Sequence, residues 1–135
     1  MDFRFDIIYE YRWMFLYGVL TTLGLTVVAT AGGSVLGLLL ALARLINPEK
    51  AGAPMRALAW VLRKISFWYV TLFRGTPLFV QIVIWAYVWF PFFVHPADGV
   101  LISGEAAIDL RRSYGALIAG SLALIANSGA YICEI

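Results

Sequence analysis

Three long apolar runs dominate the chain, and each lacks Asp, Glu, Lys and Arg. They cover residues 13–43, 75–94 and 113–133. A helix needs about 20 residues to cross the ~30 Å hydrocarbon core of a bilayer. Because water cannot satisfy backbone groups at that depth, the runs should be helical. The pattern therefore predicts an all-α integral membrane helical bundle with three transmembrane helices, at about 14–43, 76–94 and 114–135.

Composition agrees with this interpretation. The chain is 62% hydrophobic and 13% charged, whereas a soluble domain is about 45–50% apolar and about 25% charged. The alternative is that the runs are core helices of a soluble protein. Three such runs in 135 residues leave no polar shell to cover them. The first run is also about twice the usual length of a signal-peptide core, so we expect it to stay in the membrane.

The polar segments differ in charge, and this difference predicts an orientation. The connection 44–74 carries six Lys and Arg residues, while the leader 1–12 and the loop 95–112 carry two each. Loops rich in Lys and Arg remain on the cytoplasmic side. We therefore expect the leader 1–12 and the loop 95–112 outside, and the 44–74 connection in the cytoplasm.

The 44–74 connection has helical character of its own. Pro54 suits a helix start, and Leu58, Leu62 and Ile65 recur at helical spacing, with basic residues on the opposite face. This pattern is typical of a helix lying in the membrane interface. The alternative is that 55–73 forms the lower part of a long, tilted second span. The sequence leaves both readings open.

Small residues form a stripe along the first predicted span. Ala29, Gly33, Gly37 and Ala41 are four residues apart and share one helix face. Small side chains let two helices approach closely in lipid, where burial from water no longer drives association. The stripe predicts a helix-packing face.

A second motif opens the second span. In Arg74-Gly75-Thr76-Pro77, Thr76 can cap a helix and Pro77 fits its first turn. Gly75 permits a sharp entry, and Arg74 lies where a cation meets the headgroups. Gln81 lies one turn further on, at a depth where an amide needs a partner. It either makes an interhelical hydrogen bond or lines a polar transport path.

The third predicted span carries polar residues toward its end. Asn127 and Ser128 lie within the apolar run, Tyr131 falls at the inner interface, and Glu134 follows it. A carboxylate there either points into the cytoplasm or pairs with a cation such as Arg74. Polar residues within a span are candidates for function.

The sequence holds no set of residues that predicts catalysis or metal binding. His95 has no Cys, Asp or Glu at metal-ligand spacing, and Cys133 has no cysteine to pair with. No nucleophile–base set or phosphate-binding loop is present, and no basic stripe suggests nucleic acid. We therefore expect no enzyme activity, metal or cofactor in this chain, and any ATP chemistry must reside elsewhere.

Four passages resemble the membrane subunits of ABC importers for polar amino acids, the glutamine/histidine permease family. They are GVLTTLGLT at 18–26, GLLLALAR at 37–44, FRGTPLFVQ at 73–81 and NSGAYICEI at 127–135. The resemblance implies the type I ABC importer fold, usually of five spans with the N-terminus outside. Residues 13–135 would then be an incomplete transmembrane domain, an N-terminal fragment that ends before the helix that couples to the ATPase.

The resemblance also implies a function, a location and partners. The chain would form the path of an ATP-driven importer in the bacterial plasma (inner) membrane, working by alternating access. Its partners would be ATPase subunits that bind ATP, a second permease subunit (identical or different), an extracytoplasmic amino-acid-binding protein and membrane lipid. Candidates for the path are Gln81, Asn127 and Ser128. Candidates for the cytoplasmic gate or coupling region are Arg74, Gly75, Thr76, Pro77, Tyr131 and Glu134.

Two other functions remain as alternatives. A structural or assembly protein that packs in a larger membrane complex would share the composition, the charge bias and the small-residue stripe. An intramembrane enzyme would need a catalytic set that the sequence lacks.

Overall fold

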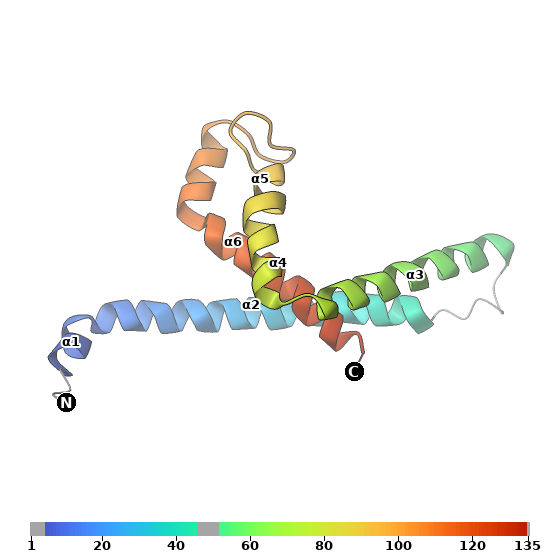
Figure 1. The fold of residues 1–135 in the computed structure, drawn as a ribbon, viewed down its shortest axis with the longest axis horizontal. Coiled ribbons are helices and arrows are strands. Elements are labelled where there is room, and N and C mark those ends of the chain that lie inside the picture. Colours follow the sequence, from blue (N-terminus) through green and yellow to red (C-terminus); the bar gives the residue numbers. More distant parts are fainter. Residues whose placement is uncertain (1–4, 46–51, 135) are drawn as a thin grey trace.

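The computed structural model describes residues 5–45 and 52–134, and these are predominantly helical (Figure 1). The helices are α1 (Phe5–Glu10), α2 (Arg12–Leu45), α3 (Ala53–Gly75), α4 (Leu78–Ile84), the π-helical segment η2 (Trp85–Trp89), α5 (Phe90–Phe93) and α6 (Glu105–Ile132). The described residues form no strand beyond one isolated bridge between Val94 and Ile102. The predicted all-α class is confirmed.

Two of these helices are long and apolar enough to cross a membrane. They are α2, with 34 residues, and α6, with 28. At 1.5 Å per residue α2 is about 51 Å long, well above the ~30 Å hydrocarbon core. A third crossing is possible if α3 and the Leu78–Phe93 helix count as one span broken by a bend of 108°. The structure thus supports a membrane helical bundle of two or three candidate spans.

The bend separates α3 sharply from the helix that follows it. The two segments therefore form either a broken span or a re-entrant loop, and whether 55–73 lies in the interface or belongs to the second span stays open. From Leu78 to Phe93 the helix is continuous through η2. Its length of about 24 Å is less than the hydrocarbon core.

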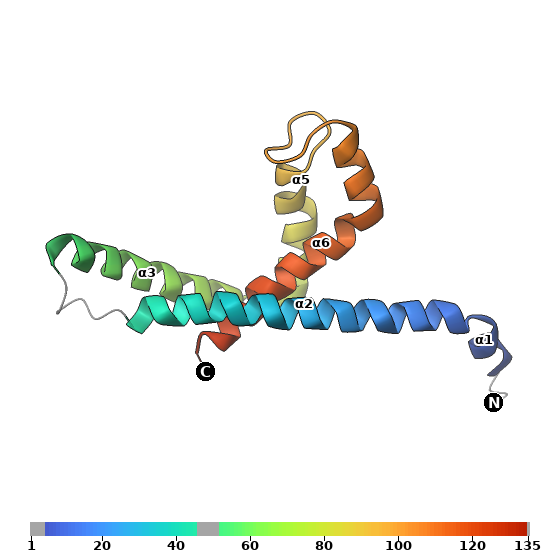
Figure 2. The same cartoon turned by 180° about the vertical axis from the view of Figure 1, so that it is seen from behind.

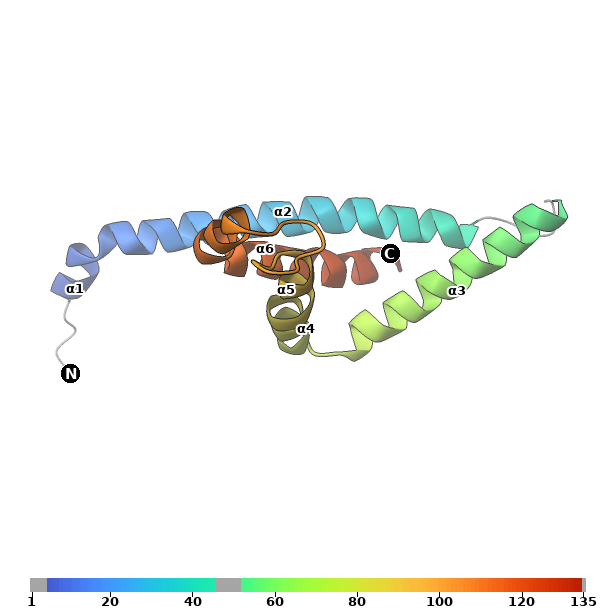
Figure 3. The ribbon, with the colours of Figure 1, turned by 90° about the horizontal axis from the view of Figure 1, so that it is seen from above.

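The helices form a long base and a short arm (Figures 1 and 2). Helix α2 is the base, and α3 runs back at an angle to its C-terminal half (Figure 3). The helix from α4 to α5 rises away from α2, and α6 returns from the tip of this arm to lie across α2. The most extensive packing is between α2 and α6.

Glycines make this α2–α6 packing close. A Cβ atom at Gly33 would lie 2.6 Å from the Cβ of Ser128, and one at Gly37 would lie 2.8 Å from the Cβ of Ile132. On the other side, a Cβ at Gly129 would lie 2.9 Å from Leu36. The helices therefore approach at a distance that only small residues permit.

The tip of the arm is a tight, hydrogen-bonded turn. The Gly99 amide donates to the His95 carbonyl at 3.1 Å, and a Cβ at Gly99 would lie 2.2 Å from the Ile102 carbonyl oxygen. Helix α6 begins directly afterwards at Glu105. The predicted outside loop 95–112 thus contains the first turns of α6.

Candidate functional site

The ends of α2, α3 and α6 meet in a charged junction, which we define as Arg44, Ser66, Arg74, Tyr131, Cys133 and Glu134. Arg74 closes α3 and forms an ion pair with Glu134 just beyond α6. Arg44 closes α2, and its guanidinium lies 3.7 Å from the other carboxylate oxygen of Glu134. Of the two placements that the sequence allowed for Glu134, the structure shows the pair with Arg74.

Arg44 is held in place from α3. It donates hydrogen bonds to the Ser66 hydroxyl at 2.8 Å and to the Ser66 carbonyl at 3.2 Å. Ser66 is fully buried, and its hydroxyl donates to the Leu40 carbonyl at 3.3 Å. The Cys133 sulfur lies 3.8 Å from the same hydroxyl. A buried serine with all its partners fixes the register of α3 against α2.

Aromatic residues extend the charged junction along α6. The Arg74 guanidinium carbon lies 5.2 Å from the centre of the Tyr131 ring, within the range of a cation–π contact. One turn back along α3, the Tyr69 hydroxyl donates to the Ala126 carbonyl at 2.6 Å. Three helices therefore share one set of polar contacts at their ends.

The charges of the junction do not balance. Two arginines face one carboxylate, so the cluster carries one excess positive charge. The Glu134 side chain is 39% exposed and that of Arg74 is 43% exposed, so solvent weakens their attraction. An exposed ion pair of this kind exchanges partners at low cost, which suits a contact that opens and closes.

The bend between α3 and α4 is organised by Gln81. Its amide nitrogen donates to the Phe73 carbonyl at 2.7 Å, to the Thr76 carbonyl at 3.0 Å and to the Thr76 hydroxyl at 2.9 Å. Gln81 is only 4% exposed. It therefore supplies donors to carbonyls that the end of α3 leaves without helical partners.

The start of α4 differs from the expected capping. The Thr76 hydroxyl donates back to the Leu72 carbonyl at 2.9 Å, so it closes α3 and does not cap α4. Pro77 precedes α4 as its N-cap residue, without a capping side chain. A Cβ at Gly75 would meet nothing within 4 Å. Proline lacks an amide donor and fixes its own φ, which accounts for the break at this point.

The other path candidates lie on α6. Ser128 faces Gly33 in the close α2–α6 contact, so it belongs to a packed interface. Asn127 is half-buried, and its side-chain amide makes no hydrogen bond within the described part of the chain. The structure thus brings Arg74, Tyr131 and Glu134 together, but no hydrogen bond between described residues joins Gln81 to Asn127 or Ser128.

The predicted packing stripe lies against α6. Ala29, Gly33 and Gly37 are buried, and Ala41 packs beside the cluster of Val70, Ala130 and Cys133. The sequence did not single out Ser66 or Tyr69. The sequence does not reveal the contacts of a serine or a tyrosine in an amphipathic segment. These contacts depend on how α3 packs against α2 and α6.

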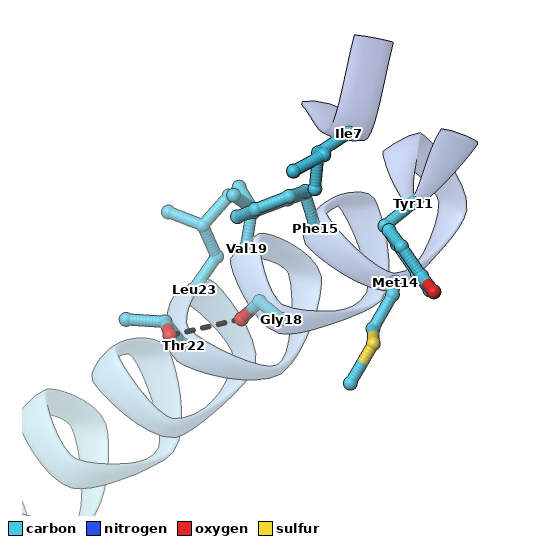
Figure 4. A pocket seen from close by; sticks show the side chains of 8 residues that line it. All are labelled: Ile7, Tyr11, Met14, Phe15, Gly18, Val19, Thr22 and Leu23. Carbon is cyan, nitrogen blue, oxygen red and sulfur yellow. Dashed lines mark hydrogen bonds between the residues drawn. The ribbon is translucent and has the colours of Figure 1, made fainter. Parts of the chain in front are cut away.

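A large hollow lies between α1 and the start of α2 (Figure 4). It measures about 650 Å³, and apart from Thr22 and Tyr11 its lining is apolar or glycine. The Thr22 hydroxyl donates to the Gly18 carbonyl of its own helix at 2.9 Å. With that donor already engaged, the hollow is better suited to apolar chains than to a polar solute.

Residues 5–45 and 52–134 contain no group of three or more His, Cys, Asp and Glu side chains that could hold a metal ion. The His95 Nδ1 atom lies 2.5 Å from a carboxylate oxygen of Asp98 and also accepts the Ala97 amide. This pair belongs to the turn at the tip of the arm.

Comparison with known proteins bears on the identity of this membrane chain. It is 30% identical to the putative glutamine transport system permease protein GlnP of Rickettsia conorii over 118 residues, which are 87% of this chain and 41% of that protein. It is 29% identical to the glutamine transport system permease protein GlnP of Escherichia coli K12 over 135 residues, which are 100% of this chain and 49% of that protein.

The chain is similar to glutamine transport permeases along almost its whole length. The resemblance to polar amino acid permeases predicted from the sequence is therefore confirmed. The chain spans about half the length of the permeases it matches. No family model and no solved structure matches it.

Proposed function

We propose that the chain forms part of the membrane permease subunit of an ATP-driven importer for a polar amino acid. In this proposal it lies in a bacterial plasma membrane, pairs with a second permease subunit and receives its substrate from an extracytoplasmic binding protein. ATP binds to separate ATPase subunits. Alternating access moves the amino acid inward.

The similarity to glutamine transport permeases carries this proposal, because it covers 87–100% of the chain. Two structural features support it. The helices are apolar enough to lie in a bilayer. Ion pairs join the ends of three helices, and the Gln81 amide is engaged at one helix break. Polar groups at such places within membrane helices are typical of transport paths and gates.

The charged junction is the proposed cytoplasmic gate or coupling region. Glu134 bridges the ends of α2 and α3 through Arg44 and Arg74. A shift of α6 would break both contacts together, since one carboxylate serves both arginines. Movement of Glu134 would thereby separate the end of α6 from the ends of α2 and α3.

The proposed substrate path includes Gln81 and Asn127. Both carry amides within apolar helices, and the side-chain amide of Asn127 has no hydrogen-bond partner in the described part of the chain. Ser128 is less accessible because of its contact with Gly33. Replacing Asn127 with Leu should lower uptake without reducing membrane insertion.

The proposal can be tested by stimulation of ATP hydrolysis. The full product of the gene, purified with its ATPase subunits in lipid, should hydrolyse ATP faster when a loaded binding protein is added. Unchanged hydrolysis, with all subunits assembled, would favour the alternative of a structural or assembly protein. The small-residue face of α2 is compatible with that alternative.

A further inference from the structure

One carbonyl oxygen at the helix break lacks a partner. The Gln81 amide nitrogen faces the Phe73 and Thr76 carbonyls, which can only accept hydrogen bonds. The nitrogen and oxygen of this amide therefore cannot be exchanged. The opposite atom, Oε1, is buried and has no hydrogen-bond partner within the described ranges 5–45 and 52–134.

A buried acceptor without a donor is costly, because it has lost its hydrogen bonds to water without replacing them. The same Gln81 side chain lines a cavity of about 120 Å³ beside the break. This volume holds a small group, since a water molecule occupies about 30 Å³ in the liquid. The site thus combines an unused acceptor with space for the donor that it lacks.

The chemistry of the walls limits which donor fits. The cavity is also lined by Leu72, Phe73, Thr76, Ile84, Trp85 and Trp89. None of these is charged, and three are aromatic. Aromatic faces attract cations and repel anions. The centres of the Trp85 and Trp89 rings lie 6.4 Å apart at the two ends of η2, and π-helical turns are frequent at functional sites.

Water is the competing occupant of this cavity. Buried water needs two to four polar partners. The Thr76 hydroxyl donates to Leu72 and accepts from Gln81, and the Thr76 carbonyl also accepts from Gln81. Oε1 is then the one side-chain acceptor of the lining that remains unused among the described residues, and the indole N–H groups of Trp85 and Trp89 can only donate.

We propose that the Gln81 cavity binds a primary ammonium group, the α-ammonium of an amino acid, through Gln81 Oε1 and the aromatic walls. One N–H donates to Oε1, and the positive charge lies against the Trp85 and Trp89 side. The rest of the molecule lies at the cavity mouth. This inference rests on the proposed transport of an amino acid and assigns the part of the substrate that the break recognises.

The test is equilibrium binding to the purified chain in lipid nanodiscs, with three probes. Radiolabelled glutamine and methylammonium carry the ammonium group, whereas 4-carbamoylbutanoate is glutamine without it. We expect saturable binding of the first two, and binding of the third about tenfold weaker or worse, since a charge-assisted hydrogen bond contributes about 1.5–3 kcal/mol.

Variants locate the site. Gln81→Leu should abolish methylammonium binding, but it also removes the donors that hold the bend. Trp85→Leu changes a wall of the cavity and leaves the donors of the bend in place. It should weaken methylammonium binding several-fold, while Trp60→Leu, on the exposed face of α3, should leave it unchanged. Circular dichroism checks that each variant keeps its helix content.

Three results would overturn the inference. They are equal binding of 4-carbamoylbutanoate and glutamine, no saturable binding of glutamine or methylammonium by the folded chain, and unchanged binding by Trp85→Leu. If the natural donor to Gln81 Oε1 is instead a lysine of another protein, neither glutamine nor methylammonium should bind saturably. If the protein transports substrates with no preference for the ammonium group, this site is refuted and the proposed function stands. If the protein binds the ammonium group but transports nothing, the proposed function alone is refuted.

Discussion

At the scale of single residues, glycine positions decide how closely α2 and α6 approach. A Cβ at Gly33 would meet Ser128 at 2.6 Å and the Gly129 amide nitrogen at 3.2 Å, so backbone would have to move. At Gly24 of the same helix, a Cβ would meet nothing within 4 Å. The two glycines therefore form a matched pair for testing the contact.

We expect Gly33→Ala to lower the thermal unfolding midpoint in detergent, since overpacking costs about 1–3 kcal/mol. Gly24→Ala should leave the midpoint unchanged or raise it. Both changes gain the same helix propensity of up to about 1 kcal/mol, so their difference isolates the contact with Ser128. Equal midpoints for the two variants would show that α6 does not pack there.

At the scale of elements, the apolar runs allowed α2 and most of α6 to be predicted. Uncharged runs of this length lie in the bilayer, where only a helix satisfies the backbone hydrogen bonds within one segment. A sharp turn after α3 was implied by the interpretation of 55–73 as an interfacial helix, but its angle was not predicted. Thr76 and Pro77 signalled a helix start, but the angle of 108° depends on the contacts of Gln81 across the break.

The charged junction was predictable only in part. Glu134 had two possible placements in the sequence, and Arg74 was one of its possible partners. The contribution of Arg44 was missed because it follows from Ser66, which is buried between helices distant in sequence. Contacts of this kind depend on tertiary packing, and no local pattern specifies them.

A double-mutant cycle tests the junction. Arg74→Gln and Glu134→Gln should each destabilise the chain slightly, and together by less than their sum, with a coupling of about 0.2–1 kcal/mol for an ion pair that is partly exposed. The measurement is the free energy of unfolding in detergent. Asp109→Asn, an exposed acid on α6, combined with Arg74→Gln should be additive. Additivity in both pairs would show that the ion pair contributes nothing to stability.

At the scale of the whole molecule, the charge asymmetry predicts how the chain lies in the membrane. The 44–74 segment is expected in the cytoplasm, and the turn at the tip of the arm outside. The contacts of Arg44 and Arg74 with Glu134 place the end of α6 beside the ends of α2 and α3. These three ends are therefore expected on one side.

Cysteine labelling measures this orientation in intact cells. In a Cys133→Ala background, which removes the only native cysteine, Leu101→Cys should react with a membrane-impermeant maleimide. Lys64→Cys should react only after the membrane is permeabilised. Both side chains are exposed, so the described residues of the chain do not shield either position. The reverse pattern would mean that the assigned orientation is inverted.

The function proposed for this chain is to help to form a path for a polar amino acid. It is tested most directly by uptake of radiolabelled glutamine into proteoliposomes that contain the gene's full product, its ATPase subunits and its binding protein. We expect saturable uptake that requires ATP and the binding protein. Absence of uptake in assembled proteoliposomes, or uptake at the same rate without ATP, would contradict it.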